Sequence, residues 1–508
     1  MYQKLVFRRQ FLLTLTPISA LTYWNCLKID QYYLYSHPDL GVHQVSDAEK
    51  IIVLIGELYD SNAPEKGNED ILKDILISAH NREGIISQLK RYAGCFVVMF
   101  KRGDDVVMLN DARGSREIYY CIESNQIVCG SQPNLVAKFS SPEVKPSRDQ
   151  TLLDFYRNHL RDSRWIGDET YFEGVKHLLP NRYLDIDKRE ARRYWPNEPI
   201  RRLSLDEAVS KSCIFIQGIM RAMVHRHSIM MAVTSGIDSR TLLAASKGVE
   251  NKVYYFINDI GFGNDHPDIS IPTEILEHIG VPFHVQEIPE DVNDEFQKIF
   301  LENTFLASNH YLSPIYHVFY KNHSEKKCVL GVGEIGRSFY GKESKNLNSY
   351  RMAYLQRYKD CRYAIRQCEQ ILPEILSVAR ASGISALDLF YWEQRLGNWG
   401  AVRNSESLIA IEKVDPYNSH LLCEVFFGVD EVYRKKRKNI LFREMIHNMW
   451  PKLIEWPINP PYTMRDKVES FLRKIGVYET LIELKYQLSY LVYLCKTGKR
   501  SSEDSKSF

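Results

Sequence analysis

Apolar positions follow two different periods along the chain. In the first third, short β-branched and aromatic runs alternate with polar turns, a pattern typical of strands. The turn Arg102-Gly103-Asp104 joins two such runs and predicts a β-hairpin, and a second hairpin is expected around Ser124-Asn125. The polar, periodic segment 67–90 predicts two helices or one broken helix. Strands are predicted at 32–35, 51–55, 95–100, 105–109, 117–121 and 126–128.

From about residue 200, buried strands alternate with amphipathic helices. Ser204-Leu205-Asp206-Glu207 has the form of a capping box and predicts a helix that runs to about residue 225. The β-α-β alternation after it predicts a parallel sheet with helices on both faces. Beyond residue 346 the pattern is mainly helical, and the charged, Ser-rich tail 499–508 is expected to be disordered. Strands are predicted at 229–233, 253–257, 283–285 and 328–330, and helices at 239–247 and 268–278.

Composition narrows the class of protein. The 508 residues include 66 Lys and Arg against 64 Asp and Glu, and 44% are hydrophobic, which excludes collagen-like, disordered and highly basic chains. A net charge of +2 gives no electrostatic reason to expect a nucleic-acid partner. We expect a cytoplasmic protein that does not cross a membrane, because no apolar run is long enough and no cysteine pattern suggests disulfides. Arg8-Arg9 before an apolar run permits two interpretations, a twin-arginine export signal or a strand entering a sheet.

The turn after the first buried strand carries the main chemical signal. Thr234-Ser235-Gly236-Ile237-Asp238-Ser239 links this strand to a helix N-terminus, where backbone N–H groups and the helix dipole favour an anion. The hydroxyls of Thr234 and Ser239 can donate to phosphate oxygens, and Asp238 can hold a Mg²⁺ that bridges them. A simple capped helix start, with Asp238 or Ser239 as the cap, is the alternative.

The turn resembles the S-G-G-x-D-S pyrophosphate loop of the asparagine synthetase family. Three later segments resemble the same family in order: His266-Pro267-Asp268, Asp415-Pro416-Tyr417-Asn418 and Lys438-Asn439-Ile440-Leu441-Phe442-Arg443. The first part is also similar to its N-terminal domain, in Gly56-Glu57-Leu58-Tyr59-Asp60 and Asp111-Ala112-Arg113-Gly114-Ser115-Arg116. The likeness covers residues 50–460.

The resemblance implies a fold class and a domain plan. The expected fold is α/β overall. An α+β antiparallel-sheet domain, similar to a class II amidotransferase, spans residues 1–197. An α/β PP-loop ATP-binding domain with a helical C-terminal part spans 198–498, followed by the tail 499–508.

The chain departs from the family pattern at two points. Glutamine hydrolysis in that family uses an N-terminal cysteine, whereas this chain begins Met1-Tyr2-Gln3, so glutaminase activity is expected to be absent. The segment 331–337 spells a dinucleotide fingerprint by letter, but the resemblance aligns it with the family's G-E-G-S-D-E-L-F loop, retaining Gly333 and Glu334. Arg337 replaces an Asp there. It either binds phosphate or a substrate carboxylate, or forms a structural salt bridge with Glu334.

Three further candidates keep two interpretations each. Asp268 lies either near the nucleotide or at a helix N-cap. Lys467 is the nearest counterpart of the family's adenylation-assisting lysine, or an exposed helical lysine. The aromatic segment 390–399, which contains Arg395, is either core packing or a substrate-stacking wall.

The expected function is an ATP-dependent, AMP-forming amide ligase that uses ATP and Mg²⁺. The loop 234–239 and Gly333 would hold pyrophosphate, Asp238 the metal, and Glu334 would orient substrate or accept a proton, beside Arg337 and Lys467. A small-molecule or peptide carboxylate and an amine or ammonia are the expected substrates, and the assembly is compatible with a homodimer. Alternatives are asparagine synthesis from ammonia, amidation of a sugar acid, and an intramolecular cyclase similar to β-lactam synthetases or lasso-peptide cyclases. A catalytically weak nucleotide-binding scaffold is the alternative from another class.

Overall fold

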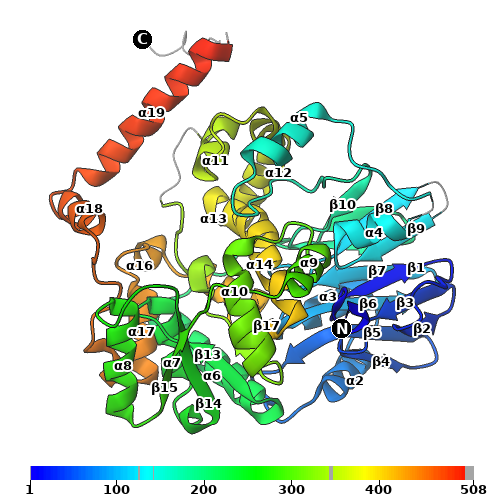
Figure 1. Cartoon of the computed structure of the whole chain (residues 1–508), viewed down its shortest axis with the longest axis horizontal. Helices are drawn as coiled ribbons and strands as arrows, with labels where there is room; N and C mark the ends of the chain where they lie inside the picture. The colour runs from blue at the N-terminus through cyan, green and yellow to red at the C-terminus, as the bar shows by residue number, and fades with distance from the viewer. Residues whose placement is uncertain (1, 124–125, 141, 342–346, 498–508) are drawn as a thin grey trace.

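The computed structural model describes residues 2–123, 126–140, 142–341 and 347–497. The expected fold class is confirmed: N-terminal antiparallel sheets precede a parallel five-stranded α/β sheet and a helical C-terminal part (Figure 1). The predicted disordered tail 499–508 lies outside the described residues, as does the turn Ser124-Asn125.

The N-terminal part contains two antiparallel sheets. Their strand orders are β10-β8-β9-β1-β3-β2 and β12-β11-β7-β6-β5-β4. The segment 67–90 forms two helices, as the first of the two readings expected. The elements, with η for 3-10 and π helices, are α1 (Tyr2–Leu5), β1 (Phe11–Thr14), β2 (Asn25–Ile29), β3 (Tyr32–Ser36), β4 (Val42–Ser46), β5 (Lys50–Tyr59), α2 (Asn68–Ser78), α3 (Arg82–Leu89), β6 (Ala93–Arg102), β7 (Asp105–Asn110), β8 (Tyr119–Glu123), β9 (Gln126–Gly130), α4 (Pro133–Phe139), α5 (Gln150–Asp154), η1 (Phe155–His159), β10 (Val175–His177), β11 (Arg182–Asp185) and β12 (Glu190–Arg193).

Strand β5 shows how the two sheets are layered. Its side chains alternate between faces because a strand has a period of two. Val53 and Ile55 belong to the core between the sheets, whereas Ile52 and Leu54 pack with residues of α2 and α3 on the outer face. Both faces of this strand are therefore buried, and its sequence reads as a continuous apolar run.

The segment after Arg8-Arg9 is a strand inside the first sheet. Strand β1 pairs with β3 on one side and β9 on the other, and all four of its residues are buried. The Arg9 side chain is also buried and donates to the carbonyl oxygen of Leu408. In this structure the segment is part of the fold, as the strand interpretation predicted.

The second part is built on a parallel sheet in the order β15-β14-β13-β16-β17. The first four strands match the predicted ones, but β17 was not predicted because two of its three residues, Glu412 and Lys413, are charged and give no apolar run. The elements are α6 (Leu205–Arg226), β13 (Ile229–Ala232), α7 (Ile237–Ala245), η2 (Glu250–Lys252), β14 (Val253–Asp259), α8 (Pro267–Ile279), β15 (Phe283–Glu287), α9 (Asp294–Asn303), η3 (Asn309–Tyr311), α10 (Leu312–Pro314), η4 (Ile315–Tyr320), β16 (Lys327–Val329), η5 (Gly333–Gly336) and β17 (Glu412–Val414).

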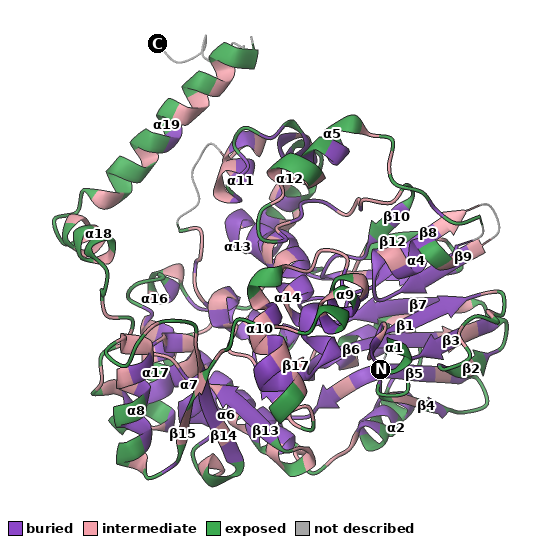
Figure 2. Ribbon diagram, in the orientation of Figure 1, coloured by how far each residue is buried: buried purple, intermediate pink, exposed green. Residues whose placement is uncertain are grey.

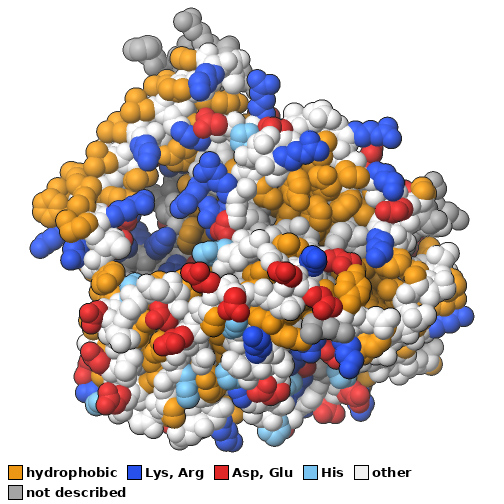
Figure 3. Space-filling model, viewed as in Figure 1, with side chains coloured by type: hydrophobic (Ala, Val, Ile, Leu, Met, Phe, Trp, Pro, Cys, Tyr) orange, Lys and Arg blue, Asp and Glu red, His pale blue; other side chains and the backbone are white. Residues whose placement is uncertain are grey.

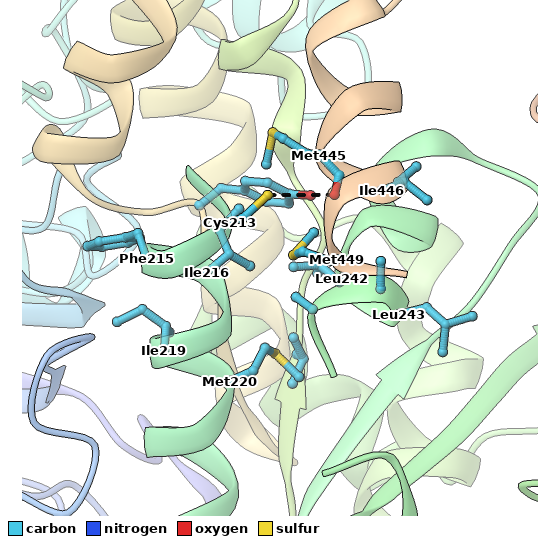
Figure 4. Packing of buried hydrophobic residues seen from close by; sticks show 14 of the residues in the cluster. Cys213, Phe215, Ile216, Ile219, Met220, Leu242, Leu243, Met445, Ile446 and Met449 are labelled. Atoms are coloured by element: carbon cyan, nitrogen blue, oxygen red, sulfur yellow. Dashed lines mark hydrogen bonds between the residues drawn. The ribbon is translucent and has the colours of Figure 1, made fainter. Parts of the chain in front are cut away.

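Helices cover both faces of this sheet, as parallel sheets require. On one face α6, α7 and the later helix α17 (Ile440–Met449) pack their apolar side chains together (Figure 4). On the other face the sheet packs against α9 and η4. The inner strands β13 and β14 are consequently largely buried (Figure 2), whereas the edge strand β15 has no buried residue.

The remaining helices form the C-terminal part, from which α18 and α19 project as an arm (Figure 1). Much of the arm is exposed: α18 has no buried residue and α19 has one, Tyr486 (Figure 2). Among the described residues, no helix combines the length and apolar character that a membrane crossing requires. The helices are α11 (Ser349–Leu355), α12 (Arg362–Ser382), α13 (Ala386–Phe390), η6 (Tyr391–Gly400), α14 (Ala401–Ser405), η7 (Glu406–Ile409), α15 (His420–Gly428), α16 (Glu431–Arg434), α17, η8 (Pro451–Ile454), α18 (Met464–Lys474) and α19 (Tyr478–Thr497).

Candidate functional site

The loop between β13 and α7 is shaped by its own hydroxyl groups. The backbone N–H of Thr234 donates to Ser239 Oγ over 3.1 Å, and the N–H of Gly236 donates to Thr234 Oγ1 over 3.0 Å. The hydroxyls of Thr234 and Ser239 lie 3.0 Å apart. Both hydroxyls therefore hold the bend in place, in addition to any contact with phosphate.

Helix α7 begins with donors that have no protein acceptor. Its N-cap is Gly236, and no side chain caps it, so neither Asp238 nor Ser239 has the capping role considered above. Within the described part of the chain, the backbone N–H groups of Ile237, Asp238 and Ser239 make no hydrogen bond. Such a helix N-terminus, at the carboxyl end of a parallel strand, favours an anion.

Asp268 reaches this loop from the start of α8. Its Oδ1 accepts hydrogen bonds from Ser235 N (3.0 Å) and Ser235 Oγ (2.6 Å). The N-cap of α8 is His266, whose Nδ1 accepts from the N–H of Asp268, so the alternative reading of Asp268 as an N-cap is wrong. Asp268 ties the loop after β13 to the helix after β14.

A second loop, after β16, brings Glu334 and Arg337 to the same place. Arg337 Nη2 forms an ion pair with Asp238 and lies 3.9 Å from Glu334 Oε1. The expected salt bridge between Arg337 and Glu334 is thus the weaker of two contacts. Because one guanidinium nitrogen touches both carboxylates, Asp238 and Glu334 face each other across Arg337.

Asp238, Glu334 and Arg337 form an acidic cluster in which one guanidinium only partly neutralises two carboxylates. Burial raises the pKa of Asp238 to about 8, Arg337 opposes the rise, and Glu334 and Asp415 add to it. Asp238 Oδ1, Glu334 Oε2 and Arg337 Nε are buried and have no hydrogen-bond partner among the described residues. Buried polar atoms without partners are uncommon, and strongly shifted carboxylates gather at functional sites.

Glycines allow the two loops to approach closely. A Cβ at Gly333 would lie 2.8 Å from Asp238 Oδ1 and 2.8 Å from Phe442 Cε1. A Cβ at Gly331 would lie 3.5 Å from the backbone nitrogen of Ser239. Side chains at these positions would fill the space in front of the acidic cluster.

Two residues that position the loop were not predicted as site residues. Tyr417 Oη donates to the carbonyl oxygen of Asp238 over 3.2 Å, and Asn459 N–H donates to that of Ser235 over 3.0 Å. Arg240, which by its position after Ser239 could face either phosphate or solvent, is fully buried and donates to the carbonyls of Leu453, Trp456 and Pro457. It therefore ties α7 to the segment 453–457.

The first part of the chain contacts the site through Asp415. Asp415 forms a buried ion pair with Arg113, while Asn418 Nδ2 donates to Asp111 Oδ1 over 2.8 Å. Burial raises the pKa of Asp415 to about 6, against the opposing effect of Arg113. The family-like segments at 111–116 and 415–418 thus meet in space.

Lys467 is separate from the cluster. It is exposed on α18, and within the described residues no hydrogen bond or ion pair links it to the loops. This placement corresponds to the alternative of an exposed helical lysine.

The residues present fit Mg²⁺ only in part. No group of three His, Cys, Asp or Glu side chains that could hold a metal occurs among the described residues. Asp238 Oδ1 and Glu334 Oε2 are nevertheless unpartnered acceptors, and Mg²⁺ usually takes one or two carboxylates together with substrate phosphates and water. The donor set suits a metal that arrives with a nucleotide and does not form a complete cage by itself.

Comparisons with known proteins add a distant structural similarity. No family model and no curated protein sequence matches the chain. A glutamine phosphoribosylpyrophosphate amidotransferase from B. subtilis, solved with ADP and GMP, matches with 10% identity and a TM-score of 0.23, over 71% of this chain and 76% of that one. An allosteric regulatory enzyme of purine biosynthesis matches with the same identity and TM-score, over 71% and 75%. At this level the comparisons do not identify an activity.

Proposed function

We propose that this chain is an ATP-dependent amide-forming ligase similar to the asparagine synthetase family. The observation that carries the proposal is the meeting of Asp238 and Glu334 around Arg337, directly beside the unpaired N–H groups at the start of α7. A site with anion-binding donors next to unpartnered carboxylate oxygens suits a nucleotide and its counter-ion.

The reaction proceeds in two steps. A substrate carboxylate oxygen attacks the α-phosphorus of ATP, an acyl-adenylate forms, and pyrophosphate leaves. The nitrogen of an amine or ammonia then attacks the acyl carbon and AMP leaves. The N–H groups of Ile237, Asp238 and Ser239 hold the departing pyrophosphate, and Arg337 fixes the Asp238 carboxylate beside it.

Asp238 and Glu334 are the residues that would hold Mg²⁺, which supplies positive charge to the phosphates when bound. Where Asp238 alone holds the metal, the Oε2 atom of Glu334 is instead the acceptor available for a proton from the attacking nitrogen. The N-terminal part acts as a scaffold, and the nitrogen comes from free ammonia or an amine.

A catalytically weak nucleotide-binding scaffold is the second candidate. The pairing of Arg337 with Asp238 favours it, because the guanidinium occupies one face of the carboxylate that would hold the metal. The two candidates agree on nucleotide binding and differ on chemistry.

ATP–pyrophosphate exchange over a panel of carboxylic acids tests the proposal. Exchange that depends on one class of acid supports the ligase, and nucleotide binding without exchange or AMP formation supports the scaffold. Asp238→Ala is expected to lower exchange by about 100-fold or more. The matched control is Asp360→Ala, at a side chain that is 71% exposed. Unchanged exchange in Asp238→Ala would refute the role of Asp238.

A further inference from the structure

The π-helix η6 carries two side chains that differ from the rest of the helix. Eight of its ten residues are buried, and the two exceptions are Arg395 and Trp399. They are four positions apart, and the guanidinium carbon of Arg395 lies 4.1 Å from the centroid of a Trp399 ring. Since π-helical turns occur often at functional sites, this half-buried pair requires an explanation.

Arg395 differs from the neighbouring arginines because no carboxylate among the described residues forms an ion pair with it. Nearby, Arg403 forms an ion pair with Glu406 over 2.8 Å, and Arg164 one with Asp162 over 3.3 Å. Burial and the charge of Arg164 lower the pKa of Arg395, and Tyr340, Tyr391 and Asp162 oppose this decrease.

The same place holds donors without acceptors. Arg395 Nη1, Trp399 Nε1 and Arg164 Nε are buried and have no hydrogen-bond partner in the described part of the chain. A buried donor that makes no hydrogen bond costs free energy. A ligand that brings acceptor oxygens to these donors would therefore bind favourably here. Guanidinium groups pair particularly well with carboxylate and phosphate oxygens.

Aromatic residues connect this pair to the acidic cluster. Tyr391 lies one turn before Arg395, and its ring is 5.4 Å from that of Tyr340, centroid to centroid. The phenol of Tyr391 is close enough to both sites to feel their charges. Burial raises its pKa, Glu334 adds to the rise, and Arg395 and Arg337 oppose it. Figure 3 shows a hollow between the arm and the body with Lys and Arg side chains around it.

We propose that Arg395 and Trp399 bind a second anionic group on the substrate whose carboxylate is activated beside Glu334. The inference rests on the proposed function and narrows its substrate to carboxylic acids with a second carboxylate or a phosphate. Tyr391 and Tyr340 form the wall between the reacting end and the anchored end.

The main test compares acids in pairs. ATP–pyrophosphate exchange is measured with dicarboxylates of four to six carbons, with their monoamides and with ω-phosphono acids of the same lengths. Acids with a second anion are expected to support exchange, and Arg395→Gln to raise their KM about 10- to 100-fold with a much smaller change in kcat. Arg395→Lys should restore part of the affinity. A monoamide that works as well as its diacid overturns the proposal.

Direct binding separates this inference from the proposed function. The same acids are titrated calorimetrically into wild type, Arg395→Gln and the control Arg366→Gln, whose partner Asp149 lies at the surface. Binding that Arg395→Gln weakens and Arg366→Gln preserves, without exchange by any acid, supports the anion site and refutes the ligase. Equal binding in wild type and Arg395→Gln, or none in either, means that Arg395 only stacks on Trp399 and that the inference is wrong.

Discussion

The two ends of the parallel sheet hold buried ionic clusters of opposite character. At the end where β16 and β17 begin, Glu412 pairs with Lys327 and with Arg116, and Glu57 pairs with Arg226 and lies 3.6 Å from Lys327. Here every carboxylate has at least two cationic neighbours. At the other end, Asp238 and Glu334 share the single guanidinium of Arg337.

The pKa directions express this difference. Burial alone would raise the pKa of Glu412, but Lys327, Arg116 and Arg9 together hold it down at about 2. For Asp238 burial outweighs Arg337, and the pKa rises to about 8. The first cluster therefore contributes stability, whereas the second lacks positive charge, which a bound cation would supply. Within one sheet, incomplete compensation distinguishes the candidate site from a structural ion network.

The largest expected effect comes from breaking the compensated cluster. Glu412→Gln leaves Lys327 and Arg116 buried with one carboxylate fewer, and we expect it to lower the free energy of unfolding by about 3–5 kcal/mol. Urea unfolding at pH 7 measures this. The control is Glu190→Gln, which breaks a surface ion pair with Arg192; the Glu190 side chain is 46% exposed. This substitution should lower the free energy of unfolding by under about 1 kcal/mol. Equal effects of the two substitutions would contradict the comparison.

The two clusters should also respond to pH with opposite signs. Between its unfolded and folded pKa values, Asp238 binds more protons in the folded state, so it makes wild type less stable as pH rises from 4 toward 8. Asp238→Asn removes this dependence on pH. The free energy of unfolding of the variant, relative to that of wild type, should therefore increase between pH 5 and 7 by at most about 1.4 kcal/mol per pH unit.

For Glu412 the folded pKa is the lower one. Its stabilising effect is complete above its usual value of 4.5 and is lost as pH falls toward 2, so the difference between wild type and Glu412→Gln should shrink in acid. Urea unfolding from pH 2 to 7 tests both signs. Parallel curves for wild type and Asp238→Asn would show that Asp238 titrates normally.

A smaller effect is expected from closing the space in front of the acidic cluster. Gly333→Ala places a methyl group against Asp238 and Phe442, which should cost about 1–3 kcal/mol of stability and lower ATP–pyrophosphate exchange. Gly67→Ala is the control, since the nearest atom to its Cβ would be Asp70 Oδ2 at 3.8 Å. Full exchange activity in Gly333→Ala would mean that the space is not used.

The smallest effect is expected at Lys467. Because this lysine is exposed on α18, Lys467→Ala should change the free energy of unfolding by under about 0.5 kcal/mol and leave exchange unchanged. Steady-state exchange kinetics measure the second part. A loss of about tenfold or more would show that Lys467 assists adenylation, as the family resemblance implies.

The fold was predictable to the extent that it depends on local pattern. Runs of apolar, β-branched and aromatic residues identified β5 and β6. The capping residue Ser204, whose hydroxyl accepts from the N–H of Glu207 over 3.1 Å, identified the start of α6. The second sheet of the N-terminal part was not separated from the first, since sheet order depends on long-range pairing. Helix α7 also starts at Ile237, two residues before the predicted start, because the loop hydroxyls fold the chain there.

The candidate site, like the fold, was predictable from local sequence only in part. The turn after the first buried strand indicated Asp238, and the family resemblance indicated Glu334 and Arg337. The structure places the three side chains together. The support from Tyr417 and Asn459 was not predictable, since both contact the loop from more than 170 positions away.

The ion pair between Arg113 and Asp415 has a consequence for any attempt to divide the chain. Arg113 comes from the N-terminal half, yet the carboxylate it neutralises lies at the edge of the candidate site in the other half. A fragment that starts at residue 198 would retain Asp415 and lose its counter-charge. A buried carboxylate of the second half is thus neutralised by a residue of the first half, so separating the halves would leave Asp415 without its cationic partner.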